Sequence, residues 1–472
     1  MHRFEDAEFD VREIPFSIRG SWLDISPVVG LHEYADDLHL VSHTTRMTPV
    51  LRLVPFHQKA AARSVVRTTS SVLTWVTDHG DVQAVFDSPE RIRLRGHAVG
   101  LRLEAASGRL TPFTGAYFFQ DPVTAAPTFS SYETGRRYRV SVIAGTVSTQ
   151  GAGALGQADR SVEIEADQSG TWEIALEEIT TAKALFRPEQ TFDQAVEAAS
   201  AEFGDFLDRV AGWRNTETPA ATLAAYVLWS ATVSPSGFVT RESVLMSKHW
   251  MDKIWSWDHC FNALALAEGE PELALDQFLA PFDHQTPEGA LPDSITQSEV
   301  LYNFVKPPIH GWALTRLRPL IGELEPRRLR EIYQSLTAWT RFWLEHRRVP
   351  GHALAHYQHG NDSGWDNSTL FDNDRVVEAP DLAAFLVIQM RTLSELAAEL
   401  GEDQAADDWR RQSVEMTAAL MTLWSGDAFG GRSTTTDEPS GHDSLLSLMP
   451  LVIGADLPAN VRDILVADSA GT

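Results

Sequence analysis

The spacing of apolar residues changes once along the chain, near residue 190, and this change limits the folds open to it. Before residue 190, segments such as "VLRLVPF" and "RRYRVSVIAGTV" alternate apolar and polar residues, and turn-forming clusters separate them. This pattern is typical of short antiparallel strands. After residue 190 the period is that of helices. The sequence therefore predicts an α+β multidomain protein with a β-sandwich at 1–190, a linker helix at 191–215 and a helical domain at 216–472.

The connections between the expected helices alternate between long and short. Long polar loops precede the second, fourth, sixth and eighth helices, whereas the links from second to third, fourth to fifth and sixth to seventh are short. In an up-and-down helical array alternate helices are parallel, so the four loops are expected to meet at one end, where functional residues should lie. The expected helices are 218–235, 257–268, 270–280, 308–321, 325–347, 379–400, 403–424, 443–453 and 458–468.

Composition excludes several classes of partner and site. A formal net charge of -26 argues against binding to nucleic acid or to anionic membranes. The single cysteine, Cys260, excludes a disulfide framework and a cysteine-based zinc site. No secretory signal and no long apolar run is visible, so a cytoplasmic protein is expected. Abundant Ala and Arg with few Lys indicate a bacterial source, and the oligomeric state stays open.

The loop "HGNDSGWDNSTLFDND", residues 359–374, combines four Asp and three Asn with one Trp. No register of the loop fits a calcium-binding pattern, so no metal is expected there. A solvated connection is the simplest alternative, but Trp365 gains little by facing water. A sugar-cleaving site explains the mixture better, because an indole can desolvate Asp366 and raise its pKa so that it donates a proton. Asn367 and its neighbours would then bind sugar hydroxyls.

Two other long loops carry residues suited to sugar binding. In "HWMDKIWSWDHCF", Trp255 and Trp257 lie close to Asp258, and aromatic faces stack on pyranose rings while carboxylates bind hydroxyl pairs. One or two of the Trp residues of this loop are equally well explained as core. Lys306 in "VKPP" is held just before a helix that begins with proline, and Asp293 follows a Pro-fixed turn. A solvated lysine and a helix N-cap are the alternative interpretations of these two residues.

In this order, the segments "WSWD", "GALPD", "VKPP" and "DSGWDNS" resemble the catalytic domain of glycoside hydrolase family 63 and its mannosylglycerate-hydrolase-like relatives. They are more distantly similar to family 37 trehalases. The resemblance covers roughly residues 215–472 and implies an (α/α)6 barrel of the six-hairpin glycosidase type, preceded by the sandwich. It also implies an enzyme that needs no cofactor and acts on an oligosaccharide or small glycoside.

The resemblance assigns roles to individual residues. Asp366 matches the general acid, and Trp257, Asp258 and Lys306 match positions that hold the sugar. Asp362 stands where the family usually has Glu and is expected to contact substrate, as are Trp255, Asp293, Trp365 and Asn367. The family inverts configuration with a Glu base in an E-x-Y motif. No such motif follows the eighth expected helix, so the barrel is expected to be C-terminally truncated and the 472-residue chain inactive by itself.

The resemblance therefore implies an inverting glycosidase that cleaves an α-glucosidic or α-mannosidic bond. Two alternatives stay open. An inverting glycoside phosphorylase needs a basic phosphate site, and the polar loops contain few Lys and Arg. A catalytically silent carbohydrate-binding protein would be consistent with the missing base.

Overall fold

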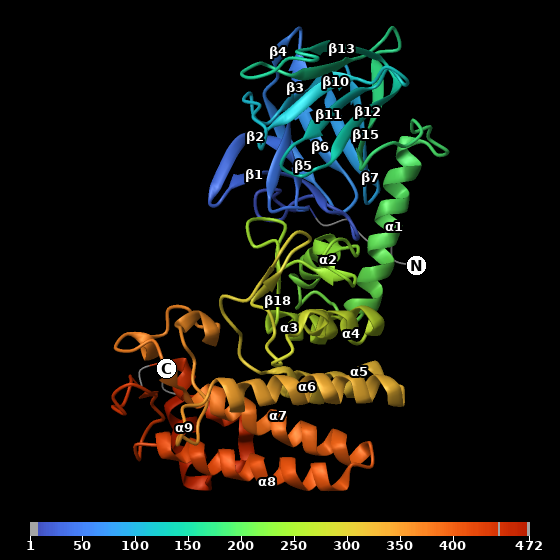
Figure 1. Ribbon diagram of the computed structural model, residues 1–472. Coiled ribbons are helices and arrows are strands. Elements are labelled where there is room, and N and C mark those ends of the chain that lie inside the picture. Colours follow the sequence, from blue (N-terminus) through green and yellow to red (C-terminus); the bar gives the residue numbers. More distant parts are fainter. Residues whose placement is uncertain (1–7, 442–443, 470–472) are drawn as a thin grey trace. The chain divides into compact units, whose positions relative to one another are not determined.

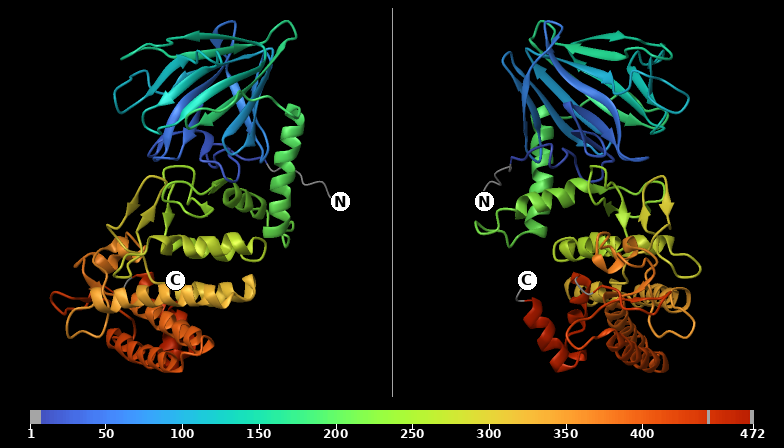
Figure 2. Two further views of the ribbon diagram at one scale, coloured as in Figure 1. Left: turned by 45° about the vertical axis from the view of Figure 1, so that its right-hand side comes forward. Right: turned by 90° about the vertical axis from the view of Figure 1, so that its left-hand side faces the viewer.

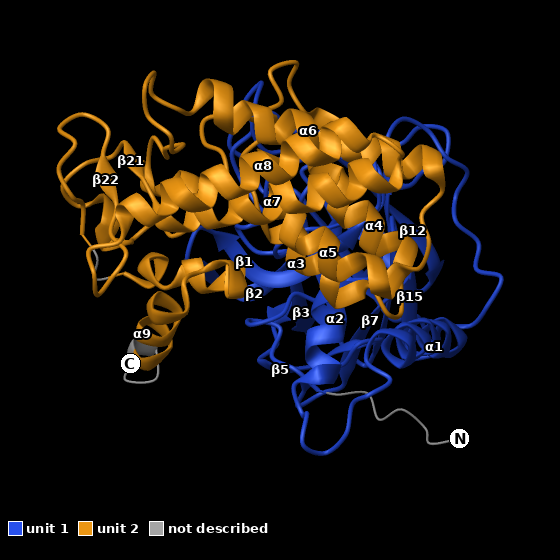
Figure 3. Cartoon of the chain, turned by 90° about the horizontal axis from the view of Figure 1, so that it is seen from below, with its two compact units in different colours: residues 1–253, 296–299 blue, residues 254–295, 300–472 orange. Residues whose placement is uncertain are grey.

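The structure is a computed structural model that describes residues 8–441 and 444–469 (Figure 1). The chain forms two compact units, coloured separately in Figure 3. Unit 1 comprises Met1–Lys253 with Thr296–Glu299, and unit 2 comprises Ile254–Ile295 with Val300–Thr472. Unit 1 thus extends beyond residue 215, where the helical domain was expected to begin, and the expected domain boundaries stay a prediction. Every helix of the described residues is too short or too polar to span a lipid bilayer.

Unit 1 contains two antiparallel sheets, which Figure 2 shows as two layers. The first has the order β1-β2-β3-β9-β14-β13, with β4 paired to β3, and the second the order β10-β11-β12-β15-β8-β7-β6-β5. The first sheet consists of β1 (Leu23–Gly30), β2 (Glu33–Ser42), β3 (Thr48–His57), β4 (Ala60–Ala61), β9 (Gly100–Ala105), β13 (Thr146–Gln150) and β14 (Ser161–Glu165). The second consists of β5 (Ser64–Thr68), β6 (Leu73–Thr77), β7 (Asp81–Ser88), β8 (Arg91–His97), β10 (Ala116–Gln120), β11 (Pro127–Ser131), β12 (Arg137–Ala144) and β15 (Thr171–Ile179). The prediction of antiparallel sheets before residue 190 is confirmed.

Helix α1 (Phe192–Val210) follows the sheets and matches the linker helix expected from the sequence. Thr191 and Gln194 form a capping box, which satisfies backbone donors that the first turn would otherwise leave unpaired. The buried face of α1 packs on Val85 of β7. Helix α2 (Ala221–Ala231) ends earlier than expected, because Thr232–Val233 (β16) pairs with Ser243–Val244 (β17).

Unit 2 is helical, and α7 is its innermost helix. Most side chains of α7 are buried, and it packs against α5, α6 and α8. Proline at the first helical position opens α4, α6 and α7, where its missing N–H costs nothing. The helices are α3 (Asp258–Leu266), α4 (Pro271–Leu279), α5 (His310–Ile321), α6 (Pro326–His346), α7 (Pro380–Glu399), α8 (Asp403–Leu420) and α9 (Ala459–Ser469).

Short elements shape the loops between these helices. The helix expected at 443–453 is replaced by two 3-10 helices, η5 and η6, because Pro450 and Gly454 interrupt the α-helical geometry. The 3-10 helices are η1 (Ala280–His284), η2 (Gly360–Ser363), η3 (Thr369–Phe371), η4 (Met421–Leu423), η5 (Leu445–Ser447) and η6 (Met449–Asp456). The short strands are β18 (Ile254–Trp255), β19 (Ser294–Ile295), β20 (Val300–Leu301), β21 (Val377–Glu378) and β22 (Arg432–Ser433).

Candidate active site

Three loops of unit 2 bring three carboxylates and one ammonium group together. We call Asp258, Asp293, Asp366 and Lys306 the acidic cluster. The Lys306 Nζ lies 3.1 Å from Oδ1 of Asp293. The charges of Lys306, Asp293 and Asp366 all act on the carboxyl group of Asp258. The predicted convergence of the long loops is thus found for the loops that precede α3, α5 and α7.

Asp258 is the carboxylate of the cluster that burial affects most clearly. It is the first residue of α3, where the helix N-terminus favours a negative charge. Burial outweighs this and raises the pKa of Asp258 to about 6. The nearby Lys306 ammonium opposes the rise, whereas the carboxylates of Asp293 and Asp366 add to it. Asp258 therefore changes its charge near neutral pH and can act as an acceptor above that pKa.

Lys306 connects two loops. Its Nζ donates a hydrogen bond to the carbonyl oxygen of Asn361 (2.7 Å), in addition to its ion pair with Asp293. Lys306 is 8% exposed, so it is not the solvated lysine that the sequence left open, and Asp293 is 7% exposed and directly precedes strand β19 rather than a helix. Apart from the ion pair, the buried Oδ1 of Asp293 accepts no hydrogen bond from the described residues. This oxygen therefore keeps acceptor capacity inside the cluster.

Trp257 packs directly against the loop that carries Asp366. Gly364 has a left-handed backbone (φ 72°) and ends η2. A Cβ at Gly364 would overlap the indole of Trp257, so only glycine allows this close approach. Trp255 lies in β18, where it pairs with Ser294. Both indoles are half-buried, consistent with side chains that are neither wholly core nor wholly solvent.

Asp362 is only 1% exposed and its carboxylate is fully used by the protein. Oδ1 accepts from the backbone N–H of Val305 (3.0 Å). Oδ2 accepts from the backbone N–H of Gln358 (2.8 Å) and from Nη1 of Arg347 (2.9 Å). The expected substrate contact of Asp362 stays a prediction, and its contacts indicate a different role, which is developed below.

Asp366 and Asn367 are exposed, and Trp365 is half-buried. The expectation that the Trp365 indole buries Asp366 is therefore wrong. The left-handed turn at Gly364 and a turn closed by the Ser368 N–H and the Trp365 carbonyl (2.9 Å) leave the Asp366 carboxylate at the surface. The carboxylate of the cluster whose pKa is raised by burial is Asp258 instead.

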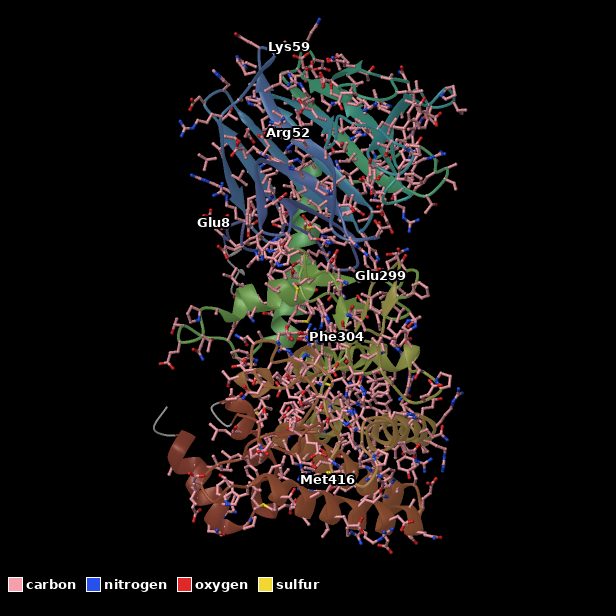
Figure 4. The ribbon with its side chains drawn as sticks, turned by 60° about the vertical axis from the view of Figure 1, so that its left-hand side comes forward. Glu8, Arg52, Lys59, Glu299, Phe304 and Met416 are labelled. Atoms are coloured by element: carbon pink, nitrogen blue, oxygen red, sulfur yellow. The ribbon has the colours of Figure 1, made fainter. Side chains whose placement is uncertain are left out.

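An aromatic pair lies beside the same loops. The rings of Phe304 and His359 are 5.1 Å apart, and both side chains are partly exposed. Figure 4 labels Phe304, on the loop that leads to Lys306. Nδ1 of His359 accepts the backbone N–H of Asn361 (3.1 Å), which leaves Nε2 as the protonated nitrogen. The pair thus joins the Lys306 loop to the Asp366 loop.

Other carboxylates on the long polar loops have different surroundings. In unit 1, Asp252 is buried against His43, and Glu299 lies near Arg46 and Lys253. In unit 2, Asp437 and Glu438 are exposed. Asp443 lies outside the described residues.

Two further groups near the Asp366 loop were not predicted from the sequence. Tyr357 donates a hydrogen bond to Oδ2 of Asp381 (2.8 Å), at the start of α7. Burial raises the pKa of Asp381 to about 7, and the bond from Tyr357 opposes the rise. The lone Asp in the apolar segment "APDLAAFLVI" is the feature that could have revealed this pair. Arg347 follows a long helix and belongs to no recognisable motif.

The described residues contain no group of three or more His, Cys, Asp or Glu that could hold a metal ion. A cavity of about 700 Å³ lies elsewhere in unit 2, lined by α7, α8 and residues such as Asp456 and Pro458. Its lining balances the carboxylates of Glu395 and Asp456 with two arginines, one of which is paired with Asp456, so the acidic cluster with its excess of carboxylates is the better candidate for chemistry.

The fold is similar to that of solved glycosidases. Antiparallel sheets followed by a helical region match six-hairpin glycosidase structures. One is a bacterial glucoamylase in complex with acarbose, with a TM-score of 0.55, 9% identity, and coverage of 89% of this chain and 68% of that chain. At this identity the likeness shows the fold alone.

Residues 251–471 match the family described as "Mannosylglycerate hydrolase MGH1-like glycoside hydrolase domain". This part of the chain is therefore similar to glycoside hydrolase domains of this family, which confirms the resemblance. A mannosylglycerate hydrolase from Rubrobacter radiotolerans is 25% identical over 143 residues, a match that covers 25% of this chain and 32% of that relative. A family 63 mannosylglycerate hydrolase from Thermus thermophilus, solved with glucose, is 22% identical, with a TM-score of 0.45 over 54% of this chain and 76% of that chain.

Proposed function

We propose that the protein is an inverting glycoside hydrolase that cleaves an α-glucosidic or α-mannosidic bond of an oligosaccharide or small glycoside. Asp366 is the general acid, and Trp257, Asp258, Asp293 and Lys306 hold the sugar. The helical region is proposed to be built on the plan of an (α/α)6 barrel. The observation that carries the proposal is the acidic cluster, in which three loops place three carboxylates around one lysine.

Several properties of the cluster suit a neutral polyol. The ionised Asp258 and the Oδ1 of Asp293 are acceptors for sugar hydroxyls. The half-buried Trp257 offers an apolar ring next to them, as pyranose binding requires. The relative from Rubrobacter radiotolerans is named a mannosylglycerate hydrolase, which supports a small glycoside as substrate.

The exposed Asp366 is free to meet a leaving group. Its carboxylate makes no hydrogen bond or ion pair with the other described residues. In its protonated form it would give its proton to the glycosidic oxygen as the bond from C1 to that oxygen breaks. A water molecule would attack C1 from the opposite face, which inverts the configuration, and would lose its proton to a carboxylate base, a role that the resemblance assigns to none of the loop carboxylates.

The charge of the cluster disfavours the phosphorylase alternative. A phosphorylase must hold a phosphate dianion beside the sugar, but here carboxylates outnumber the ammonium groups. Lys306 is already engaged by Asp293 and Asn361, and Arg347 by Asp362. Phosphate-dependent cleavage would therefore count against the proposed arrangement.

The test compares Asp366→Asn with Asp372→Asn, an exposed aspartate further along the same loop. On unactivated α-glucosides and α-mannosides, Asp366→Asn is expected to lower turnover by about 10²–10⁴-fold, because the leaving oxygen is no longer protonated. Aryl glycosides with good leaving groups should lose far less. Asp372→Asn should turn over both kinds of substrate as the wild type does. For the inverting mechanism, NMR of newly released product should show the β-anomer.

The same assay separates Asp258 from Asp366. Asp258→Asn should weaken substrate binding with little dependence on the leaving group. If the strong leaving-group dependence follows Asp258→Asn and not Asp366→Asn, the two carboxylates have exchanged the roles proposed for them. Near-normal turnover of both substrate types by Asp366→Asn would remove it from the role of acid.

A further inference from the structure

The position of Asp366 is set through its backbone, because none of the described residues holds its carboxylate by a hydrogen bond or ion pair. Its location therefore depends on how the preceding residues are fixed. We call residues 358–366 the acid loop. Within it, the Asp362 N–H donates to the His359 carbonyl (3.0 Å), and Ser363 Oγ donates to the Gly360 carbonyl (2.6 Å).

Asp362 anchors the acid loop from the inside. Its three donors come from three parts of the chain: Val305 on the Lys306 loop, Gln358 at the start of the acid loop, and Arg347 after α6. Because a buried carboxylate is costly unless all its acceptors are used, these donors fix it tightly. The residue before it, Asn361, is held by Lys306 through its carbonyl oxygen.

Arg347 is itself firmly placed. It is the C-cap residue of α6, and its guanidinium lies over the rings of Phe342 (5.5 Å) and Trp343 (5.9 Å). Its carbonyl oxygen accepts the N–H of His356 (2.7 Å), just before the acid loop. Arg347 therefore holds the loop twice, by its backbone at the entrance and by its side chain at Asp362.

We propose that Arg347 and Asp362 are positioning residues that fix the acid loop, and with it Asp366, against the Lys306 loop. This rests on the proposed role of Asp366. The pair does not touch the substrate; it acts through the backbone between Asp362 and Asp366. The short Asp side chain at 362 suits this role, because it reaches two backbone N–H groups and the Arg347 guanidinium at hydrogen-bond distance without entering the acidic cluster.

The first measurement is the kinetics of Arg347→Met and Asp362→Asn, with Arg348→Met as control. Arg348 is the next residue along and its side chain is exposed. Misplacing a catalytic group by about 1 Å costs on the order of 100-fold. Both test variants are expected to lower kcat by roughly 10- to 100-fold on unactivated glycosides, with KM within about twofold and a much smaller loss on activated aryl glycosides. Arg348→Met should match wild type, and Arg347→Lys, which keeps a cation beside Asp362, should retain most turnover.

A double variant tests whether the pair acts through the acid. In the Asp366→Asn background, Arg347→Met should change kcat by less than about twofold, because there is no acid left to position. A full additional loss in the double variant would overturn the proposal. So would an equal loss on activated and unactivated substrates, since a merely structural defect has no reason to depend on the leaving group.

Hydrogen exchange gives a readout that needs no activity. Arg347→Lys, which keeps the cation, should exchange much as wild type, whereas Arg347→Met should speed exchange of the acid-loop amides while α7 and α8 keep wild-type protection. Unchanged acid-loop exchange in Arg347→Met would overturn the proposal, as would a uniform increase throughout unit 2. A failure of the proposed function would give a different result, because Asp366→Asn would then show normal turnover whatever the Arg347 variants do.

Discussion

The two units each contain a cluster of charged side chains, and the clusters differ in balance and in access to solvent. In unit 1, His43 lies between Asp24 (2.6 Å) and Asp252 (3.0 Å). Nearby, Lys248 donates to Ser17 Oγ (2.8 Å). We call Asp24, His43, Lys248 and Asp252 the closed network. All four side chains are buried, and two basic groups face two acidic ones.

The pKa values of the closed network reflect this balance. Burial lowers the pKa of His43, but its hydrogen bonds to Asp24 and Asp252 outweigh the effect and raise it to about 9. Burial lowers the pKa of Lys248 to about 7, opposed by the charge of Asp24. In the acidic cluster of unit 2, by contrast, three carboxylates face one ammonium, and Asp258 and Asp366 are open to solvent in part.

This difference helps to distinguish a charged network that stabilises the fold from one that binds a ligand. A balanced and enclosed network leaves no charge for a ligand, so it serves to fix the chain. An unbalanced and accessible cluster keeps excess negative charge within reach of a ligand, and perturbed carboxylates in such a place are features of functional sites. Both clusters contain buried carboxylates, so burial of charge alone does not identify a site.

The largest effect is expected from breaking the closed network. His43→Ala leaves two buried carboxylates without their shared partner, which should cost about 3–5 kcal/mol of folding free energy. Chemical denaturation measures this loss, with His97→Ala as control because His97 is exposed at the end of β8. Monosaccharide affinity should stay within about twofold. A loss of affinity without a loss of stability would make the closed network a binding site after all.

A smaller effect is expected at Gly364, where the acidic cluster depends on close packing. Gly364→Ala places a Cβ in an unfavourable backbone conformation and against the Trp257 indole, which should cost about 1–3 kcal/mol. Gly401→Ala is the matched control, since Gly401 has a similar φ of 75° but no atom within 4 Å of the added Cβ. Both variants should lose stability, but only Gly364→Ala should lose turnover. Equal turnover in the two variants would show that the contact with Trp257 does not position the acid loop.

Much of the fold was predictable, because periodicity reports burial directly. The expected ranges 192–213 and 379–400 correspond to Phe192–Val210 and Pro380–Glu399. The end of α2 was not predictable, because it depends on pairing between Thr232–Val233 and a distant strand. Local sequence carries little information about such long-range contacts.

The candidate site also has one part that the sequence could predict and one part that it could not. Asp258, Asp293, Lys306 and Asp366 could be grouped because they lie on loops that precede alternate helices. The anchoring of Asp362 could not, since two of its donors are backbone N–H groups that any residue could supply. Its third donor, Arg347, lies in an unremarkable helix end. The expected burial of Asp366 failed because sequence proximity to Trp365 does not fix which way the chain turns.

The smallest expected effect is a pH dependence of stability at Asp258. Its pKa is about 6 in the folded protein, against 3.8 for an unperturbed aspartate side chain. Because the folded value is raised, the ionised Asp258 opposes folding at pH values above about 6, and this cost disappears as the pH falls towards 4. Asp258→Asn should therefore raise the melting temperature at pH 7–8 and do so less at lower pH, relative to the exposed control Asp372→Asn. A melting-temperature difference that does not vary with pH would contradict the burial of this carboxylate.

The central claim is that the acidic cluster is a sugar site with excess negative charge. Its most direct test is calorimetric titration with two ligands that share a sugar configuration and differ in charge. Protonated iminosugars of glucose and mannose configuration carry a positive charge where glucose and mannose carry none. At pH 7 the iminosugar should bind about tenfold or more tightly than its neutral counterpart, because charge-assisted hydrogen bonds are the stronger ones. This preference should shrink in Asp258→Asn and persist in Asp372→Asn. Equal affinities for both ligands, or an undiminished preference in Asp258→Asn, would contradict the account.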